Sequence, residues 1–176
     1  MARVSETGAV EIRPRRPADL PALVDALQAQ QPASRYPLRW PLPFPVEQFL
    51  VRQNEEAGWV ALVDGRVVGH VSIGRVEGER TDPFVAATGR PSSDLAIVSV
   101  LFVAPDEQGS GLGGTLLDTA VAWARARGRL PVLDVVQSHG TAVEVYRHRG
   151  WRVIGDLRPA WLPDTEEPLL LMRLDG

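Results

Sequence analysis

Residues 95–127 read LAIVSVLFVAPDEQGSGLGGTLLDTAVAWARAR, and the rest of the chain is best understood around this run. Its first part, Leu95–Val103, is almost continuously apolar and rich in β-branched residues, which is typical of a strand buried on both faces. Pro105 cannot donate a hydrogen bond to a sheet and therefore ends the strand. After several glycines, the spacing of the apolar residues predicts a helix over Thr115–Arg127, which Gly128 ends. The sequence thus predicts a strand, a glycine-rich turn and a helix.

The glycine-rich turn has the composition of an anion-binding site. Gly109, Gly111, Gly113 and Gly114 fall within six residues at the start of the predicted helix. The first amides of a helix have no intrahelical acceptor, and the helix dipole adds partial positive charge there. Glycines also allow a positive φ and a close approach of the backbone to a ligand. A phosphate or diphosphate group is the expected ligand.

Two known phosphate-binding patterns fit this turn less well. A Walker A loop requires a Lys at the position that Gly114 occupies. The dinucleotide pattern Gly-x-Gly-x-x-Gly is satisfied by Gly109, Gly111 and Gly114, and Asp134 follows twenty residues later. That pattern directly follows its strand, however, whereas here five residues intervene after Val103, and Asp134 lies inside an apolar run. A dinucleotide-binding protein stays the less favoured alternative.

The turn also resembles the signature of the GCN5-related N-acetyltransferase (GNAT) family. That signature is Gln/Arg-x-x-Gly-x-Gly/Ala at the start of a helix, and residues 108–113 fit it, with Val103-Ala104-Pro105 ahead. In that family the amides of this loop hold the pyrophosphate of acetyl-CoA. The resemblance therefore implies acetyl-CoA as cosubstrate, bound by the residues of the turn: Gln108, Gly109, Ser110, Gly111, Leu112, Gly113 and Gly114.

The composition of the 176-residue chain is that of one globular domain. The formal net charge of −3 gives no electrostatic case for binding nucleic acid. The chain has no cysteine, which excludes disulfides, thiolate metal sites and a Cys nucleophile. No apolar run is long enough to span a bilayer, and Met1–Val10 lacks the apolar core of a signal peptide. We therefore expect a cytoplasmic protein with no membrane partner, a flexible tail over residues 1–9 and a single domain over 10–176.

Local patterns predict the remaining helices and strands. Asp64-Gly65 is a strong hairpin turn signal, and Thr141 with Glu144 forms a capping box that predicts a helix start. Pro32 is expected to end the first helix, because the residue before a proline disfavours helix. In chain order, the expected segments are a strand at 10–13, a helix from 20 to 30 or 31, a helix at 46–56, strands at 59–64 and 66–75, a polar and mobile loop at 77–94, and, after the central unit, a strand at 130–136, a helix at 141–149 and strands at 151–156 and 169–174.

This order predicts an α/β fold with a mixed sheet. The strand, helix and strand of residues 95–136 imply a right-handed parallel crossover, and the flanking hairpins imply antiparallel pairs. The expected architecture is a twisted mixed sheet of about six to seven strands flanked by about four helices. The acyl-CoA N-acyltransferase fold to which the resemblance points has the same order.

A segment rich in proline and aromatic residues, residues 32–45, interrupts the regular pattern. It carries five prolines together with Tyr36, Trp40 and Phe44, and Arg35 and Arg39 add positive charge. Prolines stiffen an extended path. Two interpretations stay open: a wall of a substrate pocket, or a loop that packs its aromatic rings onto the core.

A second stretch supports the same family resemblance. The family pattern Asn-x-x-Ala-x-x-x-Tyr-x-x-x-Gly-Phe is matched by Ala142, Tyr146 and Gly150, with Trp151 in place of Phe and His139 in place of Asn. The resemblance implies that Tyr146 lies beside the thioester sulfur, where a phenol with a pKa of about 10 can protonate the departing thiolate. It also implies that His139 contacts the cofactor arm.

The resemblance further places an oxyanion donor on the central strand. In the family this donor is a backbone N–H where the strand bulges away from its neighbour, and the corresponding residues here are Leu101, Phe102 and Val103. Many family members carry a Glu on the same strand as general base, and Ile97 occupies that position. The candidates that remain for the base are Asp94, His70, Glu77 and His148.

The sequence therefore predicts an N-acetyltransferase that moves the acetyl group from acetyl-CoA to a primary amine by direct attack. No metal is implied, because the three His residues show no ligand spacing. The expected acceptor is a small-molecule amine or a peptide, and Arg35 and Arg39 point to a small, partly apolar or anionic one. A homodimer is compatible with the sequence. The alternative is a GNAT-like module that binds acetyl-CoA with little catalysis.

Overall fold

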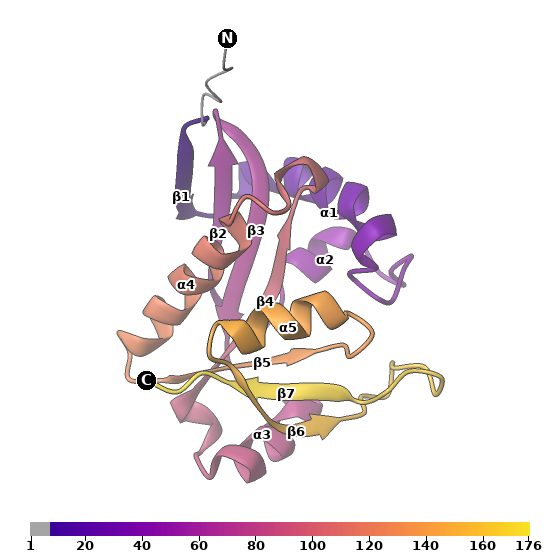
Figure 1. Ribbon diagram of the computed structural model, residues 1–176, viewed down its shortest axis with the longest axis vertical. Helices are drawn as coiled ribbons and strands as arrows, with labels where there is room; N and C mark the ends of the chain where they lie inside the picture. Colours follow the sequence, from indigo (N-terminus) through magenta and orange to yellow (C-terminus); the bar gives the residue numbers. More distant parts are fainter. Residues whose placement is uncertain (1–7) are drawn as a thin grey trace.

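The computed structural model describes residues 8–176. The tail expected over residues 1–9 falls mainly on residues 1–7, which lie outside the described part. Ala9 is joined to the hairpin turn, because its amide donates to the Asp64 carboxylate at 2.9 Å and its carbonyl accepts from the Asp64 amide at 3.0 Å. The described chain therefore begins beside the first strands of the sheet (Figure 1).

Within residues 8–176, seven strands form one mixed sheet in the order β1-β2-β3-β4-β5-β7-β6. Only β4 and β5 are parallel, and every other neighbouring pair is antiparallel. The expected mixed sheet with one parallel crossover is confirmed. The strands are β1 (Val10–Pro14), β2 (Glu55–Val63), β3 (Arg66–Gly74), β4 (Leu95–Val103), β5 (Leu130–Val135), β6 (Arg152–Leu157) and β7 (Leu169–Arg173).

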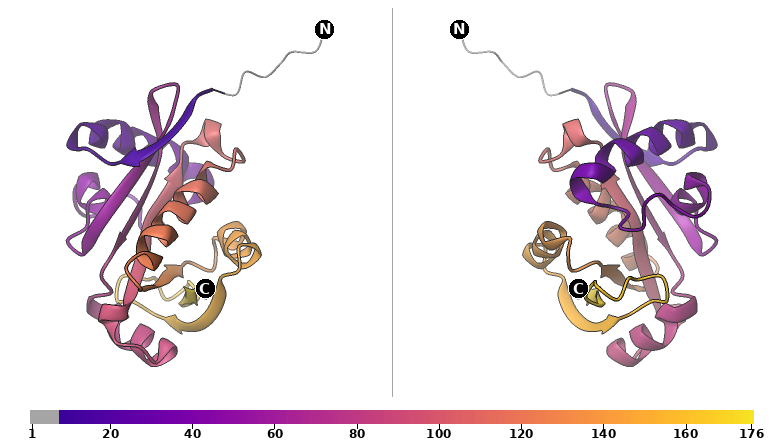
Figure 2. Two further views of the ribbon diagram at one scale, coloured as in Figure 1. Left: turned by 90° about the vertical axis from the view of Figure 1, so that its left-hand side faces the viewer. Right: turned by 90° about the vertical axis from the view of Figure 1, so that its right-hand side faces the viewer.

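Helices cover both faces of the sheet. In Figure 2, α1 and α2 lie on one side of the sheet and α4 and α5 on the other, while α3 lies at the end near β6. The α-helices within residues 8–176 are α1 (Leu20–Ser34), α2 (Val46–Leu50), α3 (Thr81–Thr88), α4 (Leu112–Arg125) and α5 (Gly140–His148), with short 3-10 turns at Pro17–Asp19, Gly78–Arg80, Ser92–Asp94 and Pro105–Glu107.

The strand, turn and helix predicted around the glycines are confirmed. Strand β4 has the predicted bounds, and α4 begins at Leu112, three residues earlier than expected, because Gly111 in a left-handed conformation (φ 87°) already serves as its N-cap. The inner face of α4 is apolar and buried, through Leu112, Leu116, Leu117, Ala120, Val121 and Ala124. This packing against β3 and β4 fixes where the glycine turn lies.

Strands β4 and β5 separate after a short parallel contact. Only Leu95–Ile97 pairs with Leu130–Val132, and beyond Ile97 the two strands diverge, as their different directions in Figure 1 show. On its other side β4 has an irregular register against β3 between His70 and Ser72, and Val100 there has a φ of 52°. The β5-facing edge of β4 is therefore open from Val98 onward.

Two predicted helix bounds were wrong. Helix α1 continues through Pro32 to Ser34, where the Arg35 amide donates to the Gln31 carbonyl oxygen at 2.6 Å. The Ser34 hydroxyl also holds this end of the helix, because it donates to Oε1 of Gln30 at 2.6 Å and accepts from the Tyr36 amide at 3.0 Å. Helix α2 ends at Leu50 instead of continuing to residue 56. Residues 55 and 56 belong to β2, where the Glu55 carboxylate pairs with the guanidinium of Arg15.

The stretch 77–94 is not a mobile loop, contrary to the prediction. It contains α3, whose Phe84 is fully buried and packs in a cluster with β4, β5 and β7. Pro83 lies in the first turn, where its missing N–H removes no helical bond, and Gly89 ends the helix with a φ of 67°. The predicted capping box was also wrong, because His139 is the N-cap of α5 and Thr141 lies within the helix.

Candidate functional site

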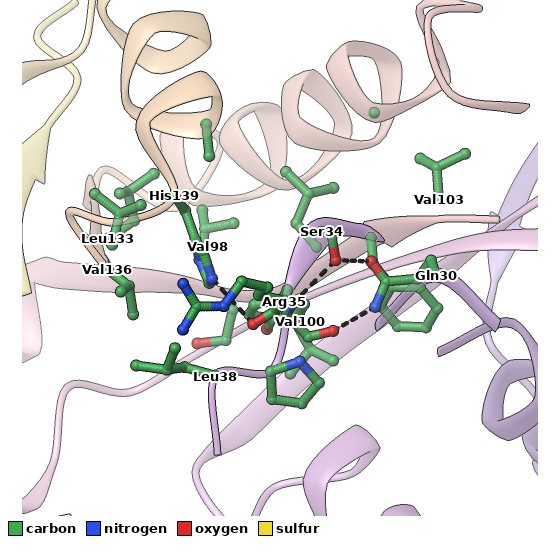
Figure 3. Close-up of a pocket in the computed structure, with 18 of the residues that line it drawn as sticks. Gln30, Ser34, Arg35, Leu38, Val98, Val100, Val103, Leu133, Val136 and His139 are labelled. Atoms are coloured by element: carbon green, nitrogen blue, oxygen red, sulfur yellow. Dashed lines mark hydrogen bonds between the residues drawn. The ribbon is translucent and has the colours of Figure 1, made fainter. Parts of the chain in front are cut away.

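A cavity of about 1240 Å³ runs through the opening between β4 and β5. It is lined from the α4 and α5 face by the glycine turn and by α5, and from the α1 and α2 face by the segment after α1. Figure 3 shows how residues from both faces, such as Val103 and Leu38, surround it. The cavity thus joins two sites on opposite sides of the sheet, and β4 forms the wall between them.

The predicted anion turn forms one end of this cavity. Gly109 and Gly111 have φ values of 81° and 87°, in the left-handed region that only glycine adopts without strain. A Cβ atom at either position would meet no heavy atom within 4 Å, so the turn has open space in front of it. The first backbone bond of α4 is donated by Thr115 to Gly111, which leaves the amides of Gly113 and Gly114 without an acceptor in the helix.

Every turn residue that the resemblance implicated lines the cavity, with Ser110 as the exception. The Ser110 hydroxyl instead donates to the Glu107 carbonyl oxygen and lies 3.5 Å from the Leu112 amide. Its contacts are therefore within the turn, where they stabilise its conformation.

Arg149 adds a cation to the anion turn, and sequence reasoning missed it. Its guanidinium donates to the Gly114 carbonyl oxygen at 3.2 Å and to the Asp118 carboxylate at 2.6 Å, and it lines the cavity. In the sequence, Arg149 looked like an ordinary basic residue at a helix C-terminus. Only the packing of α5 beside the start of α4 brings it to the turn.

The β4 wall contains the predicted donor segment. Leu101, Phe102 and Val103 all line the cavity, and they follow directly after Val100, the strand residue with positive φ. The Val100 carbonyl oxygen accepts a hydrogen bond from Nδ1 of the buried His70 at 2.7 Å. This bond holds the irregular part of β4 toward β3 and away from β5.

The two tyrosines of the chain, Tyr36 and Tyr146, both line the cavity. Burial is the main cause that raises the pKa of Tyr146 far above its usual 10, and the nearby Tyr36 and Asp134 raise it further. Burial likewise raises the pKa of Tyr36, against the opposing charges of Arg52 and Arg80. Both phenols therefore keep their protons at neutral pH and above.

His139 connects the two faces of the cavity. It is the N-cap of α5, and its Nε2 donates to the Arg35 carbonyl oxygen at 3.0 Å, as the dashed line in Figure 3 shows. Its ring also packs edge-on against Tyr36, at 6.2 Å between centroids. Burial lowers its pKa, so the ring is neutral when it makes this bond.

The proline-rich and aromatic segment forms a wall of the cavity, as one of the two sequence interpretations predicted. The rings of Tyr36 and Phe44 line it, together with Leu38, Arg39 and Leu42. Tyr36 also packs edge-on against Phe49 of α2, at 5.8 Å. We call the part of the cavity lined by this segment, by Arg52 and by Arg80 the arginine side.

The four candidates for a general base do not line this cavity. His70 is fully buried behind β4, and burial lowers its pKa to about 4. Glu77 lines a separate pocket of about 280 Å³, and it pairs with Arg75 at 2.6 Å. Asp94 and His148 are exposed at the surface.

Asp134 is a carboxylate that lines the cavity, although the sequence analysis did not name it among the candidates for the general base. It lies in the middle of β5, lines the cavity, and is ion-paired with Arg80. Its charge contributes to the raised pKa values of both Tyr36 and Tyr146, so it faces the same space as the two phenols. A carboxylate inside an apolar strand was the available signal, but the sequence analysis considered Asp134 only as part of the dinucleotide-binding pattern.

The described part of the chain has neither a metal-binding cluster nor a helix that could span a membrane. Residues 8–176 contain no cluster of three or more His, Cys, Asp or Glu side chains placed to hold a metal ion. No helix in the same part of the chain is long and apolar enough to cross a bilayer.

Comparison with known proteins gives a family match and a set of similar folds. The model of the acetyltransferase (GNAT) family matches residues 20–151. An uncharacterised N-acetyltransferase of Methanocaldococcus jannaschii is 28% identical over 110 residues, which cover 59% of this chain and 42% of that relative. The aligned part thus spans less than half the length of this curated relative.

Solved structures confirm the predicted acyl-CoA N-acyltransferase fold. A GCN5-related N-acetyltransferase from Kribbella flavida superposes with a TM-score of 0.69 at 22% identity, covering 94% of this chain and 96% of that one. The ribosomal-protein-S18-alanine N-acetyltransferase from Escherichia coli gives 0.67 at 18%, covering 94% and 93%. A putative acetyltransferase from Salmonella typhimurium, solved with its cofactor acetyl-CoA, gives 0.66 at 20%, covering 94% and 93%.

Proposed function

This chain belongs to the acetyltransferase (GNAT) family, and from that premise we propose that it transfers the acetyl group of acetyl-CoA directly to a primary amine. The observation that carries the proposal is that the glycine turn and Tyr146 line one cavity. A ligand whose diphosphate lies at the turn can extend along β4 toward the phenol. The solved relative from Salmonella typhimurium was crystallised with acetyl-CoA, which supports the same ligand here.

The residues present fit a diphosphate. Gly109 and Gly111 leave open space at the turn, and the first amides of α4 have no intrahelical acceptor. Arg149 brings a guanidinium to the Gly114 carbonyl oxygen, so its charge, which the exposed Asp118 carboxylate partly balances, lies beside these amides. We assign the diphosphate to the amides of Gly109, Gly111, Gly113 and Gly114, because the Ser110 amide donates to the Glu107 carbonyl oxygen within the turn. The adjacent arm is assigned to the open edge of β4 from Val98 to Val103.

Bound acetyl-CoA would supply a thioester, whose carbonyl carbon an amine attacks and whose sulfur leaves. An amide in the segment Leu101–Val103 is the proposed donor to the developing oxyanion, because this part of β4 lies at the bulge and borders the cavity. Tyr146 holds the proton that the departing sulfur needs, and its raised pKa keeps that proton in place. Because the chain has no cysteine, a cysteinyl acetyl-enzyme intermediate is excluded, in agreement with direct transfer.

The attacking amine must lose a proton, and Asp134 is our candidate for receiving it. A primary amine with a pKa of about 10 is mostly protonated at neutral pH, so a nearby acceptor of the proton is required. Asp134 lines the cavity from β5, whereas the candidates named from the sequence lie elsewhere. A water molecule that bridges the amine and this carboxylate would serve the same purpose.

Two observations favour a second candidate function, a module that binds acetyl-CoA with little catalysis. Ile97 stands on β4 where many family members carry a catalytic Glu, and His139 is bonded to the Arg35 carbonyl oxygen instead of being free for a cofactor arm. Such a module would bind acetyl-CoA but release no thiol with any amine. The cytoplasmic location and the homodimer stay predictions.

A thiol-release assay separates the two functions. The protein is incubated with acetyl-CoA and a panel of amines, and free thiol is followed with a disulfide reagent, which reads CoA without background because the chain has no cysteine. The transferase proposal predicts release that depends on both the amine and the enzyme. Tight binding of acetyl-CoA with no release across the panel would favour the binding module.

A further inference from the structure

The arginine side of the cavity carries more positive charge than its carboxylates neutralise. Arg35, Arg39, Arg52 and Arg80 line it, whereas Asp134 is the acidic residue that lines the same region. Like charges in one partly enclosed site repel one another unless a counter-charge is present. The balance of charge on this side therefore favours a ligand with a negative group.

Ion pairing leaves one of the half-buried arginines without a partner. Arg80 pairs with Asp134, and Arg35 lies 3.7 Å from Glu166. Within the described chain, no carboxylate lies within 4 Å of Arg52 or of the exposed Arg39. Arg52 is thus the half-buried guanidinium at the cavity wall whose counter-ion is not supplied by the protein.

The Arg52 guanidinium packs on an aromatic ring at the border of the cavity. Its Cζ atom lies 4.8 Å from the centre of the Phe49 ring, which holds the planar group by a cation–π contact. The side chain borders both the large cavity and the smaller pocket next to Arg80. A guanidinium held by one face still offers its N–H edge, which matches the two oxygens of a carboxylate.

Apolar surface completes this side of the cavity. Tyr36 and Phe49 lie edge-on to each other, and leucines and further aromatic rings surround them. An apolar or aromatic side chain of a ligand can be buried there, which removes apolar surface from water and favours binding. The apolar residues of this wall are Leu38, Leu42, Phe44 and Trp161.

We propose that the acceptor is a small amine that also carries a carboxylate and an apolar side chain, as an apolar amino acid does. Arg52 pairs with the carboxylate, Asp134 faces the amine, and the apolar wall receives the side chain. This inference rests on the proposed transferase function and names its substrate class. The same charges disfavour polyamines, whose additional ammonium groups would meet Arg52 and Arg80.

The test compares acceptors that differ only in the carboxylate. Phenylalanine, phenylalaninamide and phenethylamine share the amine and the ring, and the amide and the amine lack the negative charge. Thiol release at saturating acetyl-CoA gives kcat and KM for each compound. We expect kcat/KM for phenylalanine to exceed that for phenylalaninamide about tenfold or more, as one charge-assisted bidentate pair provides. The α-amine of phenylalaninamide has a lower pKa than that of phenylalanine, so more of the amide is present as the reactive, uncharged amine. This difference alone would favour the amide, so it cannot explain a preference for phenylalanine.

Substitutions of Arg52 test whether this residue causes the preference for a carboxylate. Arg52→Gln should raise KM for phenylalanine about tenfold and leave KM for phenylalaninamide unchanged, while Arg52→Lys should retain part of the preference. Arg90→Gln, at an exposed arginine outside the cavity, is the matched control.

The outcomes distinguish this inference from the function on which it rests. Equal kcat/KM values for the acid and the amide, or an equal loss with both in Arg52→Gln, would overturn the carboxylate-bearing acceptor while leaving the transferase intact. Acetyl-CoA binding without thiol release from any compound, including amines of other classes, would overturn the transferase and this inference with it.

Discussion

Nδ1 of His70 lies 2.7 Å from the carbonyl oxygen of Val100, and the two residues together shape the wall of the cavity. Because a carbonyl only accepts, Nδ1 carries the proton, and Nε2 accepts from the Arg15 guanidinium at 2.9 Å. Val100 has a φ of 52°, which is costly for a β-branched residue and requires support from its neighbours. His70 supplies that support from inside the sheet.

The buried His70 makes stability depend on pH. Burial lowers its pKa from 6.5 to about 4, so between these values the unfolded chain binds a proton that the folded chain does not. Stability is therefore full above about pH 6.5 and falls by about 3 kcal/mol as the pH drops to about 4. Denaturant unfolding at a series of pH values should show this slope. His70→Gln should reduce this slope and leave the part that the lowered pKa of His139 contributes, whereas the exposed His148→Gln should retain the full slope. A His70→Gln slope equal to that of the wild type would refute the assignment.

Gly111 should be required for the anion turn. The left-handed conformation costs an Ala at this position about 1–2 kcal/mol. If the backbone relaxes to relieve this strain, the amides at the start of α4 move. We expect Gly111→Ala to weaken acetyl-CoA binding about tenfold by calorimetry. Gly89→Ala, at the end of α3 with a φ of 67°, carries a comparable strain away from the cavity and serves as control. If both variants bind acetyl-CoA like the wild type, the turn does not hold the diphosphate.

Arg149 should contribute to acetyl-CoA affinity through its charge. It lies at the Gly114 carbonyl, beside the amides proposed to bind the diphosphate. Arg149→Gln should therefore raise the Kd for acetyl-CoA about threefold to tenfold, with a larger effect at low salt than at high salt. Arg147→Gln removes an exposed charge from the same helix and should change little. A salt-independent loss would point to a packing defect instead.

Asp134→Asn should lower kcat without abolishing acetyl-CoA binding. The substitution keeps the shape of the side chain but removes the carboxylate that we propose accepts the amine proton, and a positioned base typically contributes about 100-fold or more. The measurement is thiol release as a function of pH, in which the variant should regain part of its rate at alkaline pH as more of the amine becomes neutral. Asp156→Asn, at an exposed position on β6, controls for the loss of one charge. A wild-type pH profile in Asp134→Asn would exclude the carboxylate as the proton acceptor.

The sequence predicted those parts of the fold that are determined locally. The bounds of β4 follow from an apolar run closed by Pro105, and the Asp64-Gly65 turn follows from two residues that accept positive φ. Helix α3 was missed because its composition resembles a loop, and only the burial of Phe84 against distant strands stabilises it. The local helix propensity of these residues alone does not distinguish a helix from a loop.

The candidate site was predictable where a motif is contiguous and not where the fold assembles it. The glycine turn and Tyr146 belong to short sequence patterns, and the structure brings both to one cavity. Arg149 and Asp134 reach that cavity through the packing of α5 on α4 and the divergence of β4 from β5, which no local pattern encodes. The base candidates drawn from the sequence were all placed elsewhere for the same reason.

The most direct test of the central claim is the kcat for thiol release by Tyr146→Phe at saturating acetyl-CoA, with Tyr36→Phe as the matched loss of a phenol from the same cavity. If Tyr146 protonates the departing sulfur, kcat falls about 100-fold or more while the Kd for acetyl-CoA is unchanged, and Tyr36→Phe loses much less. A Tyr146→Phe enzyme that turns over at the wild-type rate would contradict the account.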